Sequence, residues 1–236
     1  MDSWLQRTSL LLGEESVLKL KKSKVVVLGV GGVGSFSTEA LARAGIGNIT
    51  IVDKDTVDIT NINRQIHANV NSVGKVKVEI MKKRILDINP KCNVVDYKTF
   101  IEEKNIEDII DKDTDYVIDA IDTVSSKISV ITWCKSNGIN IISSMGTGNK
   151  LDPTKFKVED IYNTKVCPLA KVMRNELRKK KIKNLKVLYS EEKPIKREDK
   201  VLNSNNRPVP ASISFVPPCA GLIIAGEVIK DIIKTK

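Results

Sequence analysis

The sequence is poor in histidine and aromatic residues, and it has no long apolar run. Of its 236 residues one is histidine, His67, and 4% are aromatic. No run of 18 or more apolar residues occurs, which argues against a membrane-spanning helix and a membrane partner. The N-terminus carries early acidic residues and does not resemble a secretory signal. We therefore expect a cytoplasmic protein.

The cysteines are few and widely spaced. They stand at positions 92, 134, 167 and 219 and form no CxxC pair, so no zinc half-site is predicted. They are typical of free thiols in a reducing compartment. Cys167 lies near the start of a predicted helix, which makes it the best candidate for an acyl-accepting thiol, although a buried structural thiol is the simpler interpretation. We interpret His67 as structural rather than as a base.

Positive charge is in excess and gathers late in the chain. The net charge is +10, and many of the cations lie in segment 174–186 and at positions 193, 196 and 197. A solvated helix face and a surface that binds nucleic acid both fit this pattern. The sequence leaves both interpretations open.

Buried-strand patterns alternate with helical patterns through most of the chain, which indicates a largely parallel sheet. Strands are predicted over 24–29, 48–53, 93–97, 115–122, 140–145 and 185–190, and helices over 33–45, 74–90, 104–111, 125–137, 164–180 and 217–234. A polar, proline-containing loop is expected over 190–212. We predict a single α/β domain spanning 1–236, a Rossmann-like doubly wound sheet flanked by helices. Its nucleotide-binding core would span 20–150, and an extension over 151–236 would face the substrate.

A glycine-rich turn joins the first predicted strand to the next helix. Gly29, Gly31 and Gly34 satisfy GxGxxG, and Gly32 opens the turn further. Such glycines let the backbone approach a phosphate, which the helix N-terminus then stabilises. Asp53 ends the second strand, where a carboxylate can accept hydrogen bonds from ribose hydroxyls. Strand, turn, helix and acid together predict a nucleotide site.

The residues that follow favour a triphosphate over a dinucleotide. Asn61 and Arg64 come just after the second strand, Lys77 lies on a predicted helix that begins at Gly74, and Asp122 ends the fourth strand. Cations can neutralise phosphate charge during attack, and a carboxylate can hold Mg²⁺. Singly, these residues could be a surface lysine, a turn former and a salt-bridge partner. As a set they predict a site for a nucleoside triphosphate with Mg²⁺, in which Asp122 is the metal ligand.

The motifs "GVGGVGS", "VDKDTVDITNINRQIH", "GKVKVE" and "IDAIDT" resemble the adenylate-forming superfamily that includes ubiquitin-activating enzymes, ThiF, MoeB and HesA. The resemblance implies ATP at the glycine turn, Asp53 on ribose, Mg²⁺ on Asp122, and three residues around the phosphates: Asn61, Arg64 and Lys77. It also implies that Arg7, in "QRTSLLLGEE", reaches the ATP of a neighbouring subunit. The expected assembly is a homodimer with shared ATP sites.

Further motifs extend the resemblance over nearly the whole chain. "GTGNKLDPTKFKVEDIYNTKVCPLAKVMRNELRK" and "SISFVPPCAGLIIAGEVI" resemble the tRNA threonylcarbamoyladenosine dehydratases of that superfamily. This resemblance implies adenylation of the carboxylate of threonylcarbamoyladenosine in tRNA, followed by ring closure with release of AMP. The implied partners are tRNA carrying threonylcarbamoyladenosine and a sulfur-transfer protein.

Three alternatives stay open. Activation of a ubiquitin-like sulfur-carrier protein, as in MoeB and ThiF, would share the first half-reaction. A nucleotide-binding regulatory module and an NAD oxidoreductase would share only the glycine turn. The absence of CxxC pairs and the basic C-terminal third favour the tRNA enzyme over the carrier activator. The set of Arg64, Lys77 and Asp122 argues against the other two.

Overall fold

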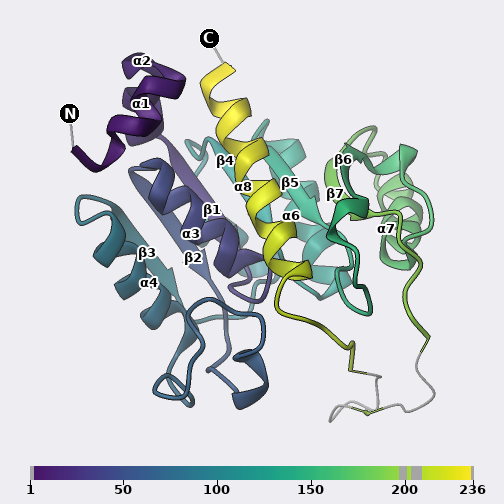
Figure 1. Ribbon diagram of the computed structural model, residues 1–236. Helices are drawn as coiled ribbons and strands as arrows, with labels where there is room; N and C mark the ends of the chain where they lie inside the picture. The colour runs from purple at the N-terminus through teal and green to yellow at the C-terminus, as the bar shows by residue number, and fades with distance from the viewer. Residues whose placement is uncertain (1–2, 197–200, 203–208, 235–236) are drawn as a thin grey trace.

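Seven strands form one sheet in the computed structural model, which describes residues 3–196, 201–202 and 209–234. The strand order is β3-β2-β1-β4-β5-β7-β6. Their bounds are β1 Lys24–Leu28, β2 Asn48–Val52, β3 Asn93–Tyr97, β4 Tyr116–Asp119, β5 Asn140–Ser144, β6 Phe156–Asp160 and β7 Lys186–Ser190. Figure 1 shows the sheet in the middle of the molecule with helices on its two faces. The predicted Rossmann-like, doubly wound α/β class is confirmed.

The sheet is parallel except at one edge. β1 pairs with β2 on one side and β4 on the other, so the strand order reverses between β1 and β4. β6 pairs antiparallel with β7 at the edge. β6 was not predicted, because it has five residues and its apolar and charged alternation covers two apolar positions, Phe156 and Val158.

Helices cover both faces of the sheet. α3 (Gly34–Ala44), α4 (Lys77–Ile88) and α8 (Val216–Lys234) pack on one face, and α5 (Ile106–Ile109), α6 (Val124–Ser136) and α7 (Pro168–Lys179) on the other. Alternate residues of β1 point to opposite faces, so Val25 and Val27 join the first core and Val26 and Leu28 the second. Short 3-10 helices lie at Ser3–Leu5, Ile59–Asn61, Glu103–Asn105, Pro153–Lys155 and Ile161–Asn163.

Local signals set the helix ends near the glycine turn. Gly45 has a φ of 89° and ends α3, with its N–H donating to the carbonyl of Ala42. α4 ends at Ile88 with Asn89 as its C-cap, just before Pro90, which agrees with the predicted stop near 89–90. The N-terminal helices α1 (Gln6–Leu12) and α2 (Glu14–Lys22) were not predicted.

None of the helices in the described ranges has both the length and the apolarity needed to cross a bilayer.

The last helix returns to the start of the fold. α8 lies beside α3, as Figure 1 shows, and a Cβ on Gly221 would be 2.3 Å from the carbonyl oxygen of Val33. Ser37 donates a hydrogen bond of 3.0 Å from its Oγ to the carbonyl of Gly221. This close approach places Pro217, in the first turn of α8, beside the glycine turn.

Candidate active site

A cavity of about 560 Å³ opens at the carboxyl ends of the central strands. Its lining includes residues that follow β1, β2, β4 and β5. This is where the strand order reverses, and open α/β sheets bind ligands at such a point because the loops there diverge to opposite faces. The cavity is large enough for a nucleotide-sized ligand.

The glycines of the turn have different tasks. Gly29 has a φ of 86°, and a Cβ there would be 2.7 Å from the carbonyl oxygen of Ala120 on the neighbouring strand. A Cβ on Gly34 would be 1.7 Å from the carbonyl oxygen of Gly29, so Gly34 permits the close contact between α3 and the turn. A Cβ on Gly31 would meet nothing within 4 Å. Gly31 therefore leaves space on the cavity side of the turn.

Asp53 braces the turn from the end of β2. Its Oδ2 accepts a hydrogen bond of 2.7 Å from the N–H of Val30, and its Oδ1 accepts one of 2.9 Å from the N–H of Asp55. Each carboxylate oxygen can accept a second hydrogen bond. Asp53 also lines the cavity, so it can hold the turn and accept hydrogen bonds from a ligand.

A capped 3-10 helix presents Asn61 and Arg64. Asp58 caps Ile59–Asn61, with the Asn61 side chain accepting from the Asp58 N–H. Arg64 Nη1 donates to the carbonyl of Thr60 at 3.0 Å and to Asn63 Oδ1 at 2.7 Å. Burial lowers the pKa of Arg64 while Asp58 raises it, and a guanidinium stays charged in either case. Its other N–H donors are left for a ligand.

Lys77 begins α4 and is fixed by one partner. Its Nζ lies 3.2 Å from Asp55 Oδ2, and its backbone N–H donates to the carbonyl of Asp55. The Lys77 side chain is 7% exposed, whereas that of Asp55 is 52% exposed. Because Lys77 also lines the cavity, its ammonium can attract an anion that binds there as well as Asp55.

Asp122 projects from the turn after β4. It is exposed at the cavity, and its Oδ1 accepts a hydrogen bond of 3.3 Å from Thr123 Oγ1. Mg²⁺ needs few protein ligands, since one or two carboxylates with substrate phosphates and water suffice. The described residues contain no cluster of three or more metal-ligating side chains. A single carboxylate, Asp122, at the same cavity as the glycine turn fits a Mg²⁺ ion that takes its other ligands from substrate phosphates and water.

The structure brings together eight of the ten predicted site residues. Those that line the cavity are Gly29, Gly31, Gly32, Asp53, Asn61, Arg64, Lys77 and Asp122. Gly34 lies behind the turn and acts through packing. Arg7 lies on α1, exposed and outside this cavity.

Comparison with known proteins gives this geometry a family. The model of the ThiF family matches residues 5–236. The chain belongs to the ThiF family.

Individual relatives are similar over nearly the whole chain. The tRNA threonylcarbamoyladenosine dehydratase of Bacillus subtilis is 49% identical over 238 residues, covering 97% of this chain and 94% of the relative. The crystal structure of the E. coli tRNA N6-threonylcarbamoyladenosine dehydratase TcdA in complex with ATP superposes with a TM-score of 0.88 at 34% identity, covering 98% of this chain and 96% of that one. The adenylyltransferase and sulfurtransferase UBA4 of Vanderwaltozyma polyspora is 41% identical, but over only 62% of this chain and 34% of its own.

The sequence analysis missed one wall of the cavity in this ThiF-family protein. Residues 144–148 and 209–212 line the cavity after β5 and before α8. Asn149, at a φ of 58°, joins the two segments. Its N–H donates to the carbonyl of Ala211 and its Oδ1 accepts from the Ala211 N–H, at 2.8 and 2.9 Å. The polar, glycine-rich sequence SSMGTG after a buried strand was the available signal.

The two remaining candidates lie in the interior. Cys167 is 4% exposed at the N-cap of α7 and does not line the cavity, which agrees with a structural thiol. His67 is 2% exposed, and neither ring nitrogen has a hydrogen-bond partner among the described residues. Burial, with Lys77 and Arg84 nearby, lowers the pKa of His67 to about 4. Both agree with the interpretation of these side chains as structural.

Proposed function

We propose that this protein is an ATP-dependent tRNA threonylcarbamoyladenosine dehydratase. The observation that carries the proposal is the convergence of the glycine turn, two cations and Asp122 on one cavity in a chain that matches such dehydratases from end to end. The full-length similarity to TcdA bound to ATP and to AMP supports adenylation chemistry.

The first step would be attack by a carboxylate oxygen of threonylcarbamoyladenosine on the α-phosphorus of ATP. Pyrophosphate leaves and an acyl adenylate forms. Asp53 would hold the ribose hydroxyls, and Asn61, Arg64 and Lys77 would stabilise the charge on the phosphates. Mg²⁺, held by Asp122, would supply further neutralisation of phosphate charge.

Ring closure would follow within the modified nucleoside. A nucleophile of the same side chain attacks the acyl carbon, and AMP leaves with both electrons of the acyl–oxygen bond. A carboxylate has no good leaving group by itself, whereas AMP is one. Because nucleophile and electrophile are tethered, closure needs little further loss of entropy.

The tRNA would lie along α7. Leu169, in the first turn of α7, lines the cavity, and Lys180 at the other end lies 11 residues further on. At 1.5 Å per residue, this spacing puts the C-cap of α7 about 16 Å along the helix axis from Leu169. A modified base in the cavity would leave neighbouring phosphates within reach of Lys180, Lys181 and Lys183. In this arrangement residues 20–150 would form the nucleotide-binding core, and residues 151–236 would form the extension that faces the tRNA substrate.

The assembly would be a homodimer with shared ATP sites. Arg7 is exposed on α1 next to Leu10 and Leu11, each 82% exposed, and an apolar surface of this kind fits burial against a second copy. Arg7 would then reach the partner's ATP. A tRNA substrate and free cysteines favour the cytoplasm. A sulfur-transfer protein is a further possible partner on family grounds.

Pyrophosphate exchange into ATP tests the proposal and separates it from its alternative. Exchange should appear with tRNA carrying threonylcarbamoyladenosine and not with a ubiquitin-like carrier protein. The carrier alternative draws support from the similarity to UBA4, which is confined to part of the chain. Exchange with carrier alone would replace the dehydratase proposal by that alternative.

A further inference from the structure

An ion pair between Lys127 and Asp119 lies entirely inside the protein. Lys127 Nζ and Asp119 Oδ2 are 3.0 Å apart, and both side chains are 0% exposed. Lys127 belongs to α6, and Asp119 is the last residue of β4. Neither lines the cavity, so neither can touch a nucleotide there.

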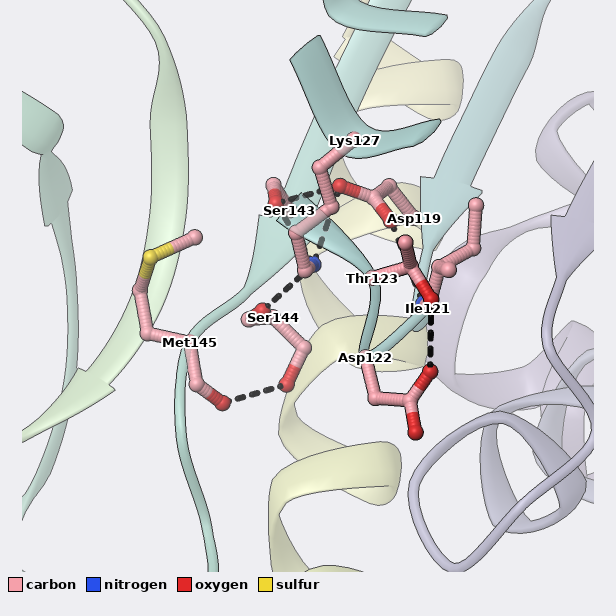
Figure 2. A network of polar contacts seen from close by, with 8 residues as sticks. All are labelled: Asp119, Ile121, Asp122, Thr123, Lys127, Ser143, Ser144 and Met145. Atoms are coloured by element: carbon pink, nitrogen blue, oxygen red, sulfur yellow. Dashed lines mark hydrogen bonds and ion pairs between the residues drawn. The ribbon is translucent and has the colours of Figure 1, made fainter. Parts of the chain in front are cut away.

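The pair is the centre of a hydrogen-bond network that Figure 2 shows. Lys127 Nζ also donates to Ser143 Oγ at 3.2 Å and to the carbonyl of Ser144 at 2.8 Å. Ser143 Oγ donates to Asp119 Oδ2 at 2.6 Å. Asp119 Oδ1 accepts a hydrogen bond of 3.2 Å from the Ile121 N–H. The buried charges therefore have partners on every side.

The network joins two walls of the cavity. The bond from Ile121 to Asp119 closes the turn that carries Asp122, and Figure 2 shows Asp122 on that turn. The bond from Lys127 to Ser144 holds the start of the wall formed by 144–148. Lys127 thus fixes the turn that carries Asp122, through Asp119, relative to the wall formed by 144–148.

Stability alone does not explain the pair. Its neighbours in β4 and β5 include Val117, Ile118 and Ile142, all buried. Replacing a buried ion pair with uncharged residues of similar volume is often neutral or stabilising, because desolvation offsets the attraction. A charged pair that joins two loops of the cavity can instead fix the positions of those loops relative to each other.

We propose that Lys127 is a positioning residue, which sets Asp122 against the 144–148 wall through Asp119 and Ser144. The inference rests on the proposed function, in which Asp122 holds Mg²⁺. Side chains that orient a metal ligand typically change metal affinity or activity 10- to 100-fold when removed. Lys127 acts at a distance from the reacting atoms and touches none of them.

The test uses the full-length double variant Asp119→Asn/Lys127→Met, which removes both charges with little change in volume. ATP affinity is measured by calorimetry with Mg²⁺ and with EDTA, beside pyrophosphate exchange. We expect the Mg²⁺-dependent part of the affinity and the turnover to fall roughly 10-fold or more. Affinity in EDTA should stay unchanged, because the glycine turn is untouched. Amide exchange should accelerate at 121–123 and 144–148.

The matched control makes the same two substitutions in another ion pair, Lys186→Met/Asp231→Asn. That pair, 2.6 Å long, lies at the amino end of β7, away from the cavity. The control variant should have the Mg²⁺ dependence of ATP affinity, and the amide exchange at 121–123, of the wild type. Ser143→Ala, which removes one bond to Asp119, is the milder second variant and should shift Mg²⁺ dependence in the same direction.

Unchanged amide exchange and Mg²⁺ dependence in the folded double variant, or in Ser143→Ala, would overturn the positioning role. A wild-type protein without ATP–pyrophosphate exchange would instead remove the proposed function. Amide exchange needs no nucleotide, so it decides the positioning in that case as well.

Discussion

Gly34 and Gly29 meet so closely that a Cβ on Gly34 would lie 1.7 Å from the carbonyl oxygen of Gly29. No side chain can relieve this contact, because the opposing atom belongs to the backbone. Gly31, three residues earlier, has nothing within 4 Å of its Cβ position and faces the cavity. Two glycines of one motif therefore answer different requirements, one of packing and one of ligand access.

Gly34→Ala should lower the free energy of unfolding by roughly 3 kcal/mol or more, at or beyond the upper end of the usual cost of overpacking. Gly31→Ala should change it by less than about 1 kcal/mol, since its methyl group enters open space. Gly31→Ala should nevertheless weaken ATP binding, because the methyl group occupies the phosphate approach. Urea unfolding and calorimetry check the pair. Equal destabilisation by both variants would contradict the division.

ATP with Mg²⁺, rather than NAD, should protect the protein against heat. At 100 times its Kd a ligand stabilises by about 2.7 kcal/mol, which for a chain of this size raises the Tm by roughly 5 to 10 °C. The reason is the convergence of Arg64, Lys77 and Asp122 on the cavity. Thermal unfolding with ATP, ATP plus EDTA, and NAD makes the comparison. Equal protection by NAD would count against the triphosphate site.

Asp122→Ala and Arg7→Ala should each abolish adenylation. Both side chains are exposed and outside the core, so we expect both variants to fold. If Arg7 serves the partner's site, a mixed dimer has one site with both residues intact. Random mixing makes half the dimers mixed, so about a quarter of wild-type activity should return. A mixture that stays inactive, although mass spectrometry shows subunit exchange, would rule out sharing.

Charge reversal at the C-cap of α7 and just beyond it should weaken tRNA binding. Lys180, Lys181 and Lys183 are exposed, whereas Lys179 pairs with Glu176 at 2.7 Å and is left in place. Each lost phosphate contact should reduce the log–log salt slope by roughly 0.7 to 0.9, because fewer counterions are released. ATP affinity should be unchanged.

The matched control reverses three exposed lysines elsewhere: Lys22, Lys83 and Lys112. It changes the net charge equally and should leave the salt slope as in the wild type. If both triple variants behave alike, the effect belongs to overall charge and α7 returns to the interpretation of a solvated face. Arg197, part of the same predicted basic surface, lies outside the described residues.

Stability should fall in mild acid because of His67. Its folded pKa of about 4 lies below the unfolded value of about 6.5. The unfolded state therefore takes up the proton first, and stability is full above pH 6.5 and declines as the pH falls toward 4. The loss between pH 7 and pH 5 should be about 2 kcal/mol. His67→Leu should flatten this part of the profile in urea titrations, and an unchanged profile would assign the acid sensitivity to other groups.

Much of the fold was predictable because its signals are local. β1, β2 and α3 carry their periodicity, and Gly45 its left-handed cap, within a few residues. The order β5-β7-β6 and the antiparallel edge could not be read from the sequence, because pairing depends on contacts between distant segments. β6 alternates apolar and charged residues over too few positions, Phe156 to Glu159, to stand out from the surrounding polar sequence.

The candidate site divides in the same way. The glycine turn, Asp53 and Asp122 follow strands directly. Because the carboxyl ends of parallel strands lie at the same edge of a sheet, the sequence alone predicts that these residues are close together. The wall made by 144–148 and 209–212 depends on Asn149 meeting Ala211 across 62 positions of sequence. Such a contact has no local signature. The buried Lys127 was hidden for another reason, since in sequence a lysine on a helix predicts an exposed side chain.

The packing of α8 on α3 has a consequence for synthesis on the ribosome. The glycine turn is made early, but Pro217 beside Gly32, and Gly221 against Val33, are made almost 190 residues later. At 5 to 20 residues per second, that interval is on the order of 10 to 40 s. Throughout it the nascent sheet lacks one side of its nucleotide cavity. A partly made chain therefore cannot assemble the complete cavity until the last residues before α8 and its first turn have been made.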